Sequence, residues 1–249
     1  MSLLGDIYSI FWLDLRNMRH HWKSTIATSL VLPLLYLVAF GYGLGRDMTV
    51  DGSSYLMFVI PGIVALTSFS TSFNSAASKL QVDKIFYKSL DELLMSPVSS
   101  YSIIIGKSLI GVLRGMISAV TIYLVGLLLA PSILVNPLLF FVMLLLSCFV
   151  YALFGVLVAL TVKTHQGMST FSTLVILPMT FLCGTFFSLS QLPSAAKILL
   201  YFLPLTHSAD ILRSTALDRA FPLWSFVCLL IFGIIFFIGG MITLKKSSV

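Results

Sequence analysis

The sequence predicts an all-α membrane protein with six transmembrane helices, and three observations support this fold class. Hydrophobic residues make up 58% of the 249 residues, and the mean hydropathy is +1.04. Charged residues make up only 10% of the chain, against about 25% in soluble domains. The apolar residues also gather into runs of about 20, the length that a helix needs to cross a bilayer. We therefore expect most apolar side chains to face lipid or other helices.

Residues 1–23 are predicted to form an amphipathic helix at the membrane interface rather than a span. Apolar residues recur there every three or four positions, which places them on one helical face: Leu4, Ile7, Phe11, Leu15, Met18 and Trp22. Polar residues, Asp14 among them, mostly occupy the other faces, and the tryptophans suit the headgroup region. The helix is either a simple anchor or a docking surface for a cytoplasmic partner. Its interrupting charges argue against a cleavable signal peptide.

Residues 24–249 are predicted to form the transmembrane domain. The predicted spans lie at about 24–43, 55–75, 103–130, 137–161, 168–187 and 223–244. Ten basic residues flank these spans on one side, Lys79 and Lys107 among them, and four flank them on the other. Because Lys and Arg concentrate in cytoplasmic loops, both termini are predicted to be cytoplasmic. The net charge of +6 then reflects this bias rather than nucleic-acid binding.

The stretch 188–222 is apolar but does not read as a span, because Pro193 and Pro204 interrupt it. Two short helices that enter the outer leaflet and return, one on each side of Pro204, fit the pattern better. Backbone at that depth needs protein or water as hydrogen-bond partners. We therefore expect a packed re-entrant helical pair before the last span.

Signals for enzymatic chemistry are weak. The three cysteines lie in apolar runs, and the four histidines form no pair at metal-ligand spacing, so neither a disulfide framework nor a metal site is expected. A Gly-Lys-Ser triplet at positions 106–108 lacks the glycine that a phosphate-binding loop needs five positions earlier, where Tyr101 stands. We expect no catalytic residue, no cofactor and no ATPase site in this chain.

The second predicted span is unusually polar. Its hydroxyl and amide residues are Thr67, Ser68, Ser70, Thr71, Ser72, Asn74, Ser75 and Ser78. They either pack and bond back to their own helix or line a water-accessible path for an amphipathic substrate. The spans are predicted to contain no Asp or Glu, which argues against proton coupling without excluding it. Arg114 in the third span either reaches back to the interface or has a gating role.

Small residues mark one face of the third predicted span. Gly111, Gly115 and Ala119 recur there at four-residue spacing. This pattern allows helices to approach closely in lipid. It is most typical of packing within a bundle, and a contact between two copies of the chain is the alternative.

The predicted cytoplasmic loop 79–107 is too long for a plain turn. It contains three leucines beside two acids and a proline that stops a short helix: Leu90, Leu93, Leu94, Asp91, Glu92 and Pro97. Ser89 and Glu92 have the spacing of a capping box at the start of this helix. A short helix that carries both leucines and acids is predicted to be a contact element.

Three stretches resemble type-2 ABC exporter permeases, and most of all the group of nodulation-factor and drug-export permeases. They are LDELLMSPVSSYSIIIGKSL in the loop, VIPGIVALTSFSTSFNSAA in the second span and PLTHSADILRSTAL before the last span. The resemblance covers nearly the whole chain. The loop and the Pro61–Gly62 pair are its more specific parts.

The resemblance implies two permease copies paired with two separate ABC ATPase subunits, which bind ATP and Mg. The loop helix would be the coupling helix that contacts the ATPase through Leu90, Asp91, Glu92, Leu93, Leu94 and Pro97. The N-terminal helix would add a second ATPase contact. The substrate path would be lined by Phe69, Phe73 and Asn74 of the second span and by Thr180 and Phe181 of the fifth.

The function expected from these features is that of a permease in a bacterial or archaeal inner membrane, without nucleic-acid partners. It would move an amphipathic substrate out of the cytoplasm or inner leaflet: a lipid-linked or acylated glycan, a lipid or a hydrophobic drug. One alternative is a secondary carrier or channel without a dedicated ATPase. Another is a membrane enzyme that acts on lipids, although paired acids or His–acid pairs are missing.

Overall fold

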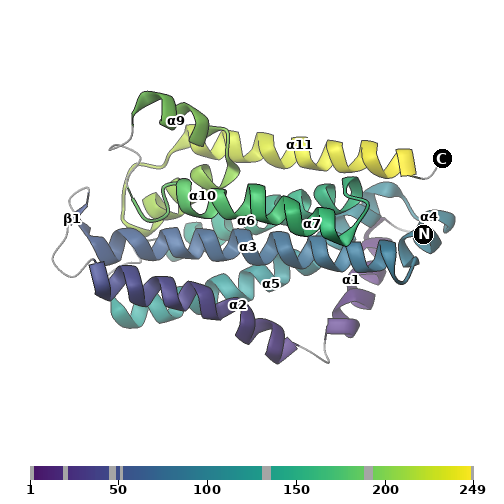
Figure 1. Ribbon diagram of the computed structural model, residues 1–249, viewed down its shortest axis with the longest axis horizontal. Coiled ribbons are helices and arrows are strands. Elements are labelled where there is room, and N and C mark those ends of the chain that lie inside the picture. Colours follow the sequence, from purple (N-terminus) through teal and green to yellow (C-terminus); the bar gives the residue numbers. More distant parts are fainter. Residues whose placement is uncertain are drawn as a thin grey trace.

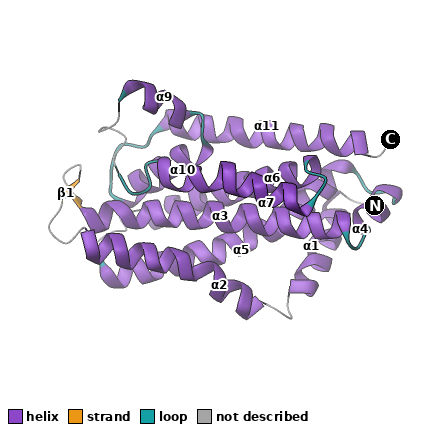
Figure 2. Cartoon of the chain, viewed as in Figure 1, coloured by secondary structure: helices purple, strands orange, loops and turns teal. Residues whose placement is uncertain are grey.

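The computed structural model describes residues 3–18, 22–44, 49–50, 53–130, 136–187 and 193–247. Within these ranges the chain is almost entirely helical (Figure 2). The exception is an antiparallel pair of two-residue strands, β1 (Thr49–Val50) and β2 (Ser53–Ser54). The predicted all-α fold class is therefore confirmed for the described residues. Arg19 and Arg46, two of the cations counted above, lie outside them.

The helices form one elongated bundle (Figure 1). In chain order they are α1 (Leu3–Met18), α2 (Trp22–Tyr36), the π-helix η1 (Leu37–Leu44), α3 (Tyr55–Ile85), α4 (Ser89–Met95), α5 (Ser100–Leu129), α6 (Pro137–Thr161), α7 (His165–Phe171), the π-helix η2 (Ser172–Ile176), α8 (Leu177–Leu182), α9 (Ser194–Tyr201), α10 (Pro204–Ala216) and α11 (Leu223–Ser247). The helix α4 and the C-terminal end of α11 lie at one end of the bundle, and β1 and α9 lie at the other (Figure 1).

Four helices are long and apolar enough to cross a membrane by length and composition: α3, α5, α6 and α11. They match four of the six predicted spans. The predicted spans 24–43 and 168–187 coincide with two helical stretches that change to π-helical geometry partway, α2–η1 and α7–η2–α8. Each of these stretches contains a proline, Pro33 or Pro178, which removes a backbone donor from the helix.

The helix α3 lies at the centre of the bundle, with 83% of its most apolar stretch buried. Glycines let its neighbours approach: a Cβ atom on Gly111 of α5 would lie 2.7 Å from the Ser72 carbonyl oxygen, and one on Gly155 of α6 would lie 2.5 Å from that of Phe73. Ala119 is fully buried. The small-residue face of the third predicted span therefore packs within the bundle, as expected for close helix contacts.

Two short helices, α9 and α10, lie at the end of the bundle opposite α4, and Pro204 is the first residue of α10. That this pair enters the outer leaflet and returns stays a prediction. In α10 nearly every residue is buried. The Arg213 guanidinium lies 3.7 Å from the centre of the Phe58 ring and donates to the carbonyl oxygens of Phe58 (3.2 Å), Gly184 (3.0 Å) and Thr185 (3.4 Å). A Cβ atom on Gly62 would lie 2.5 Å from the Thr185 oxygen. This close approach accounts for glycine after Pro61.

Candidate functional site: a hydroxyl-lined cavity and an exposed face at α4

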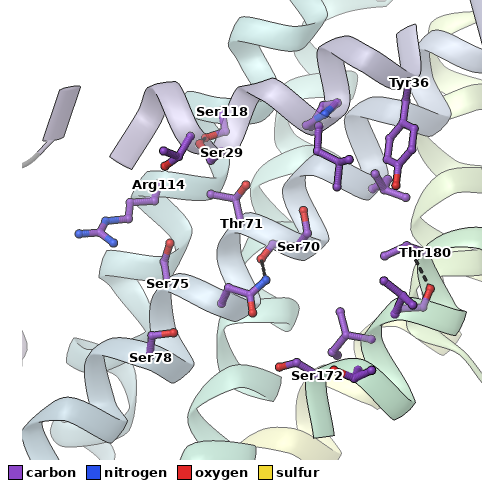
Figure 3. Close-up of a pocket in the computed structure, with 18 of the residues that line it drawn as sticks. Ser29, Tyr36, Ser70, Thr71, Ser75, Ser78, Arg114, Ser118, Ser172 and Thr180 are labelled. Atoms are coloured by element: carbon purple, nitrogen blue, oxygen red, sulfur yellow. Dashed lines mark hydrogen bonds between the residues drawn. The ribbon is translucent and has the colours of Figure 1, made fainter. Parts of the chain in front are cut away.

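A cavity of about 600 Å³ opens between α2, α3, α5 and the α7–η2–α8 stretch (Figure 3). Eleven of its lining residues carry hydroxyl groups: Thr28, Ser29, Ser70, Thr71, Ser75, Ser78, Ser118, Ser169, Ser172, Thr173 and Thr180. Tyr36, Asn74 and Arg114 add a phenol, an amide and a cation. Five aliphatic residues complete the lining: Leu32, Pro33, Leu66, Ile176 and Leu177. The cavity therefore offers both hydrogen-bonding groups and apolar surface.

Helical spacing divides the polar second span into two faces. Ser70, Asn74 and Ser78 are four residues apart, so they share one face of the helix. This face lines the cavity. Phe69 and Phe73 lie on another face and are fully buried. Their rings pack against rings of α6, with centroids 4.9 Å apart for Phe69 and Tyr151. Outside the lining, Thr67 bonds back to Ile63 and Ser68 to Ala65 of the same helix.

The structure places the predicted path residues in different surroundings. Asn74 lines the cavity and donates to the Ser70 carbonyl at 2.8 Å, and Thr180 lines the opposite wall (Figure 3). Phe69 and Phe73 lie in the core, outside the lining. Phe181 is 43% exposed and meets Tyr36 edge-on. A role of any of them in transport remains a prediction.

Sequence reasoning named only Thr180 and Phe181 from the α7–η2–α8 stretch and no individual residue from α2. Ser169 and Thr173 are four residues apart and reach the cavity from α7 and η2, and Ser29 is within 3.0 Å of Ser118 across α2 and α5. The spacing of Ser and Thr in the predicted spans 24–43 and 168–187 was the available signal. That spacing does not predict the π-helical turns. Turns of this kind are frequent at functional sites.

Arg114 is the one charged residue among the described residues that line the cavity. It comes from α5, is partly buried, and lies at one side of the cavity near Ser75 and Ser118 (Figure 3). This position places a cation beside hydroxyl groups. Both earlier interpretations of Arg114, reaching to the interface and gating, are compatible with it.

A buried cluster of four charges joins α1, α3 and α5. Lys107 of α5 lies 3.1 Å from both carboxylate oxygens of Asp14 in α1 and 2.6 Å from Asp83 in α3. Lys79 of α3 lies 3.3 Å from Asp14 and 2.5 Å from Asp83. Asp14, Asp83 and Lys107 are at most 2% exposed. Two positive and two negative charges offset each other, as buried charges must.

This cluster corrects two expectations from the sequence. Lys79 and Lys107 were counted as loop cations, but the predicted loop 79–107 is in fact the end of α3, the helix α4 and the start of α5. Asp83 was expected outside the spans, yet it lies in α3, which continues ten residues beyond the predicted end. The reason is that opposite charges on neighbouring helices pair with one another, so these polar residues continue the helix instead of ending it.

The α1 helix packs on the bundle through a face next to the apolar face, which was predicted to lie at the headgroup level. Its buried residues are Asp6, Ile10 and Asp14, at four-residue spacing, whereas Leu4 is 79% exposed. The side chains of Met18 and Trp22, also assigned to the predicted face, lie outside the described part of the chain. The ion pair between Asp14 and Lys107 fixes the orientation of α1 on the bundle.

The Gly-Lys-Ser triplet has a packing role here. A Cβ atom on Gly106 would lie 2.8 Å from Ile10, so glycine lets α1 approach α5. The next residue, Lys107, then reaches Asp14.

The predicted contact helix exists as α4, and its exposed face carries acids and apolar residues. Leu90 is 1% exposed, while Asp91, Glu92 and Met95 are exposed. Phe86 and Tyr87, just before α4, are 68% and 71% exposed. These side chains form a contact face at one end of the bundle, which we call the α4 face.

The predicted capping box at Ser89 and Glu92 is wrong. Lys88 is the N-cap, with a positive φ of 53°, and it makes no side-chain cap; Ser89 is already helical. The helix ends at Met95. The next residue, Ser96, precedes Pro97, and the residue before a proline favours extended geometry. The predicted stop at Pro97 is therefore confirmed.

A family model described as "ABC-2 type transporter" matches residues 6–217. The chain belongs to this family. The match to the ABC-2 type transporter family includes the cavity, the charge cluster, the α4 face and the two short helices. The resemblance to ABC exporter permeases is thereby confirmed at the level of the family.

Three relatives of this ABC-2 family chain align over most of its length. The inner membrane transport permease YadH of Escherichia coli (strain K12) is 28% identical over 186 residues, which cover 74% of this chain and 72% of that permease. Nodulation protein J of Rhizobium leguminosarum bv. viciae is 27% identical over 207 residues, which cover 80% and 78% of the two chains. Nodulation protein J of Rhizobium meliloti (strain 1021) is 28% identical over 197 residues.

Proposed function

We propose that this chain is the multi-pass permease subunit of an ATP-driven exporter in a bacterial or archaeal inner membrane. The observation that carries the proposal is the hydroxyl-lined cavity between helices of a chain of the ABC-2 type transporter family. In this proposal two copies of the chain assemble with two ATPase subunits, and those subunits bind ATP and Mg. The chain crosses the membrane six times, with α2–η1 and α7–η2–α8 as the two irregular spans.

The lining supports an amphipathic substrate. Hydroxyl and amide groups from all four walls can hydrogen-bond a polar group, and the aliphatic residues can contact an acyl or aromatic part. The acids that proton or cation coupling uses in membranes are not found among the described lining residues. A separate ATPase as the energy source agrees with this composition.

The distribution of charge supports an orientation with the α4 face in the cytoplasm. Lys84, Lys88 and Lys163 lie at or near the α4 end, as do Lys245 and Lys246 at the end of α11. An excess of Lys at one end marks the cytoplasmic side. The α4 face would then meet the ATPase through Asp91, Glu92 and Met95.

Replacing Asn74 with leucine should reduce export while leaving the complex assembled. The side chain is exposed in the cavity, and a lost hydrogen bond of about 1 kcal/mol corresponds to roughly fivefold weaker apparent affinity for substrate. The measurement compares exported lipids and glycans in a deletion strain that carries each variant. Thr121→Val is the matched control, because Thr121 bonds back to Ile117 and lies outside the lining. Equal export by the Asn74 variant and the control would show that the cavity is not part of the transport path.

Replacing Glu92 with lysine should weaken copurification with the ATPase subunit, since the exposed α4 face would gain a charge of the opposite sign. Glu92→Gln removes the charge alone and should lie between wild type and Glu92→Lys. Asn74→Leu serves as the control that retains the ATPase. Unchanged pull-down together with unchanged ATPase stimulation would contradict an ATPase contact at this helix.

A further inference from the structure

A second cavity, of about 480 Å³, lies between the two short helices and α11. Its floor is one face of α11, formed by Trp224, Cys228, Ile231 and Ile235, which are three or four residues apart and so lie in line. Its other walls are Phe232, the short-helix residues Ile198, Tyr201 and His207, and Phe202. We call this cavity the α11 groove. It shares no lining residue with the hydroxyl-lined cavity.

The α11 groove opens on the exposed surface of α11. Only 28% of the most apolar stretch of α11 is buried, the lowest share among the four span-length helices. Trp224 and Phe202 at the groove are 72% and 71% exposed, and Ile231 and Ile235 are about half exposed. A helix of this length and hydropathy is surrounded by hydrocarbon over most of its surface, and an exposed tryptophan at its first turn suits the headgroup level.

We infer that the α11 groove binds an acyl chain of a membrane phospholipid as a fixed site. Three features point to this occupant. The surface that lines the groove is almost entirely apolar, which disfavours a soluble polar ligand. The volume of 480 Å³ falls within the roughly 300–1,000 Å³ typical of ligand sites. The groove runs along a helix that faces lipid, so an acyl chain enters it from the bilayer without crossing water.

His207 lines the groove, but its ring is buried. Its Nε2 atom lies 2.8 Å from the Tyr201 carbonyl oxygen, which can only accept a hydrogen bond, so Nε2 carries the proton. Burial lowers the pKa of His207, which favours the neutral ring at neutral pH. Its Nδ1 atom is then an acceptor, and within the described part of the chain it has no hydrogen-bond partner. Because Nδ1 is buried and Nε2 is already bonded, neither nitrogen is open to a ligand, and the surface that the groove presents to an acyl chain is apolar.

Cys228 makes the inference testable on the unaltered protein. The chain has three cysteines, and Cys148 and Cys183 are buried whereas Cys228 is partly exposed in the groove. N-ethylmaleimide should therefore label Cys228 in permease that has been washed free of lipid in detergent. Adding palmitoyl-oleoyl phosphatidylethanolamine should slow this labelling, and glycerophosphoethanolamine, which has the headgroup without chains, should not. Equal labelling rates with and without the lipid would overturn the inference.

A matched pair of variants on α11 provides the second measurement. Cys228→Phe fills the groove, while Val227→Phe adds a ring to a neighbouring position that is 46% exposed and lies outside the groove. Native mass spectrometry of gently purified permease should show a phospholipid adduct on each chain in the wild type and in Val227→Phe, and its loss in Cys228→Phe.

The other occupants of such a groove give different results in the same samples. If two copies of the chain met through the groove, Cys228→Phe would change the oligomeric state and leave bound lipid unchanged. If lipid bound only as part of the general annulus, both phenylalanine variants would retain the same adducts. Either result would overturn a fixed acyl-chain site on α11.

Discussion

Replacing Lys107 with methionine should destabilise the permease by about 3–5 kcal/mol, the cost of breaking a buried ion pair by removing one partner. The Lys107 side chain lies within 3.1 Å of Asp14 and 2.6 Å of Asp83. Without it, Lys79 alone would face two buried carboxylates, and the cluster would carry a net negative charge. The expected readout is a lower thermal unfolding midpoint and a lower yield of folded protein in detergent.

Two further variants separate charge imbalance from loss of packing. Adding Asp14→Asn to Lys107→Met returns the cluster to neutrality, so the double variant should be more stable than Lys107→Met alone. Such non-additivity is the signature of residues in one charge network. Lys246→Met, on the exposed end of α11, should change little. If the double variant lost stability additively, the four residues would not act as a balanced cluster.

Replacing Arg213 with methionine should cost roughly 3 kcal/mol, at the upper end of the range for hydrogen bonds to a charged group. The guanidinium connects α10 to α3 and to the chain after α8 through three carbonyl oxygens. It also covers the Phe58 ring, a contact that strengthens when water is excluded. Methionine can fill part of the volume but leaves these oxygens without this donor.

The Arg213 prediction is checked by thermal unfolding and by protease sensitivity of the 183–203 region. Arg213→Lys keeps the charge and loses the planar fork, so it should lie between wild type and Arg213→Met. Equal stability of the lysine and methionine variants would show that the geometry of the guanidinium is unimportant. Equal stability of Arg213→Met and wild type would show that the contacts of the guanidinium contribute nothing to the stability of the fold.

The charge cluster and the α4 face lie on consecutive parts of the chain. Asp83 precedes α4 by six residues, and Lys107 lies two turns into α5, which follows it. A force applied to α4 is therefore passed to two helices that are tied to each other and to α1 by buried charges. Both helices also line the cavity. In the proposed exporter, this connection is the physical route by which an ATPase that moves α4 would act on the cavity.

Composition and local pattern alone determined that this chain is helical and built for a membrane. An apolar run such as 137–161 is stable in hydrocarbon as a helix, because a helix satisfies every backbone hydrogen-bonding group within the segment. The short helix before Pro97 and the helix break at Pro204 were also readable, since proline restricts its own backbone and that of its neighbour. The family resemblance named Asn74 together with Phe69 and Phe73 as path residues; Asn74 lines the cavity, whereas both phenylalanines are buried in the core.

Only the tertiary structure decided which side chains face one another. Helical spacing places Phe73 and Asn74 on different faces, but which of these faces meets α6 and which meets the cavity depends on how α3 is rotated in the bundle. Asp14, Lys107 and the Lys79–Asp83 pair are far apart in sequence, and each by itself is typical of a solvated segment. The fold brings them together and buries them, and a buried charge is stable only where opposite charges or hydrogen bonds compensate it.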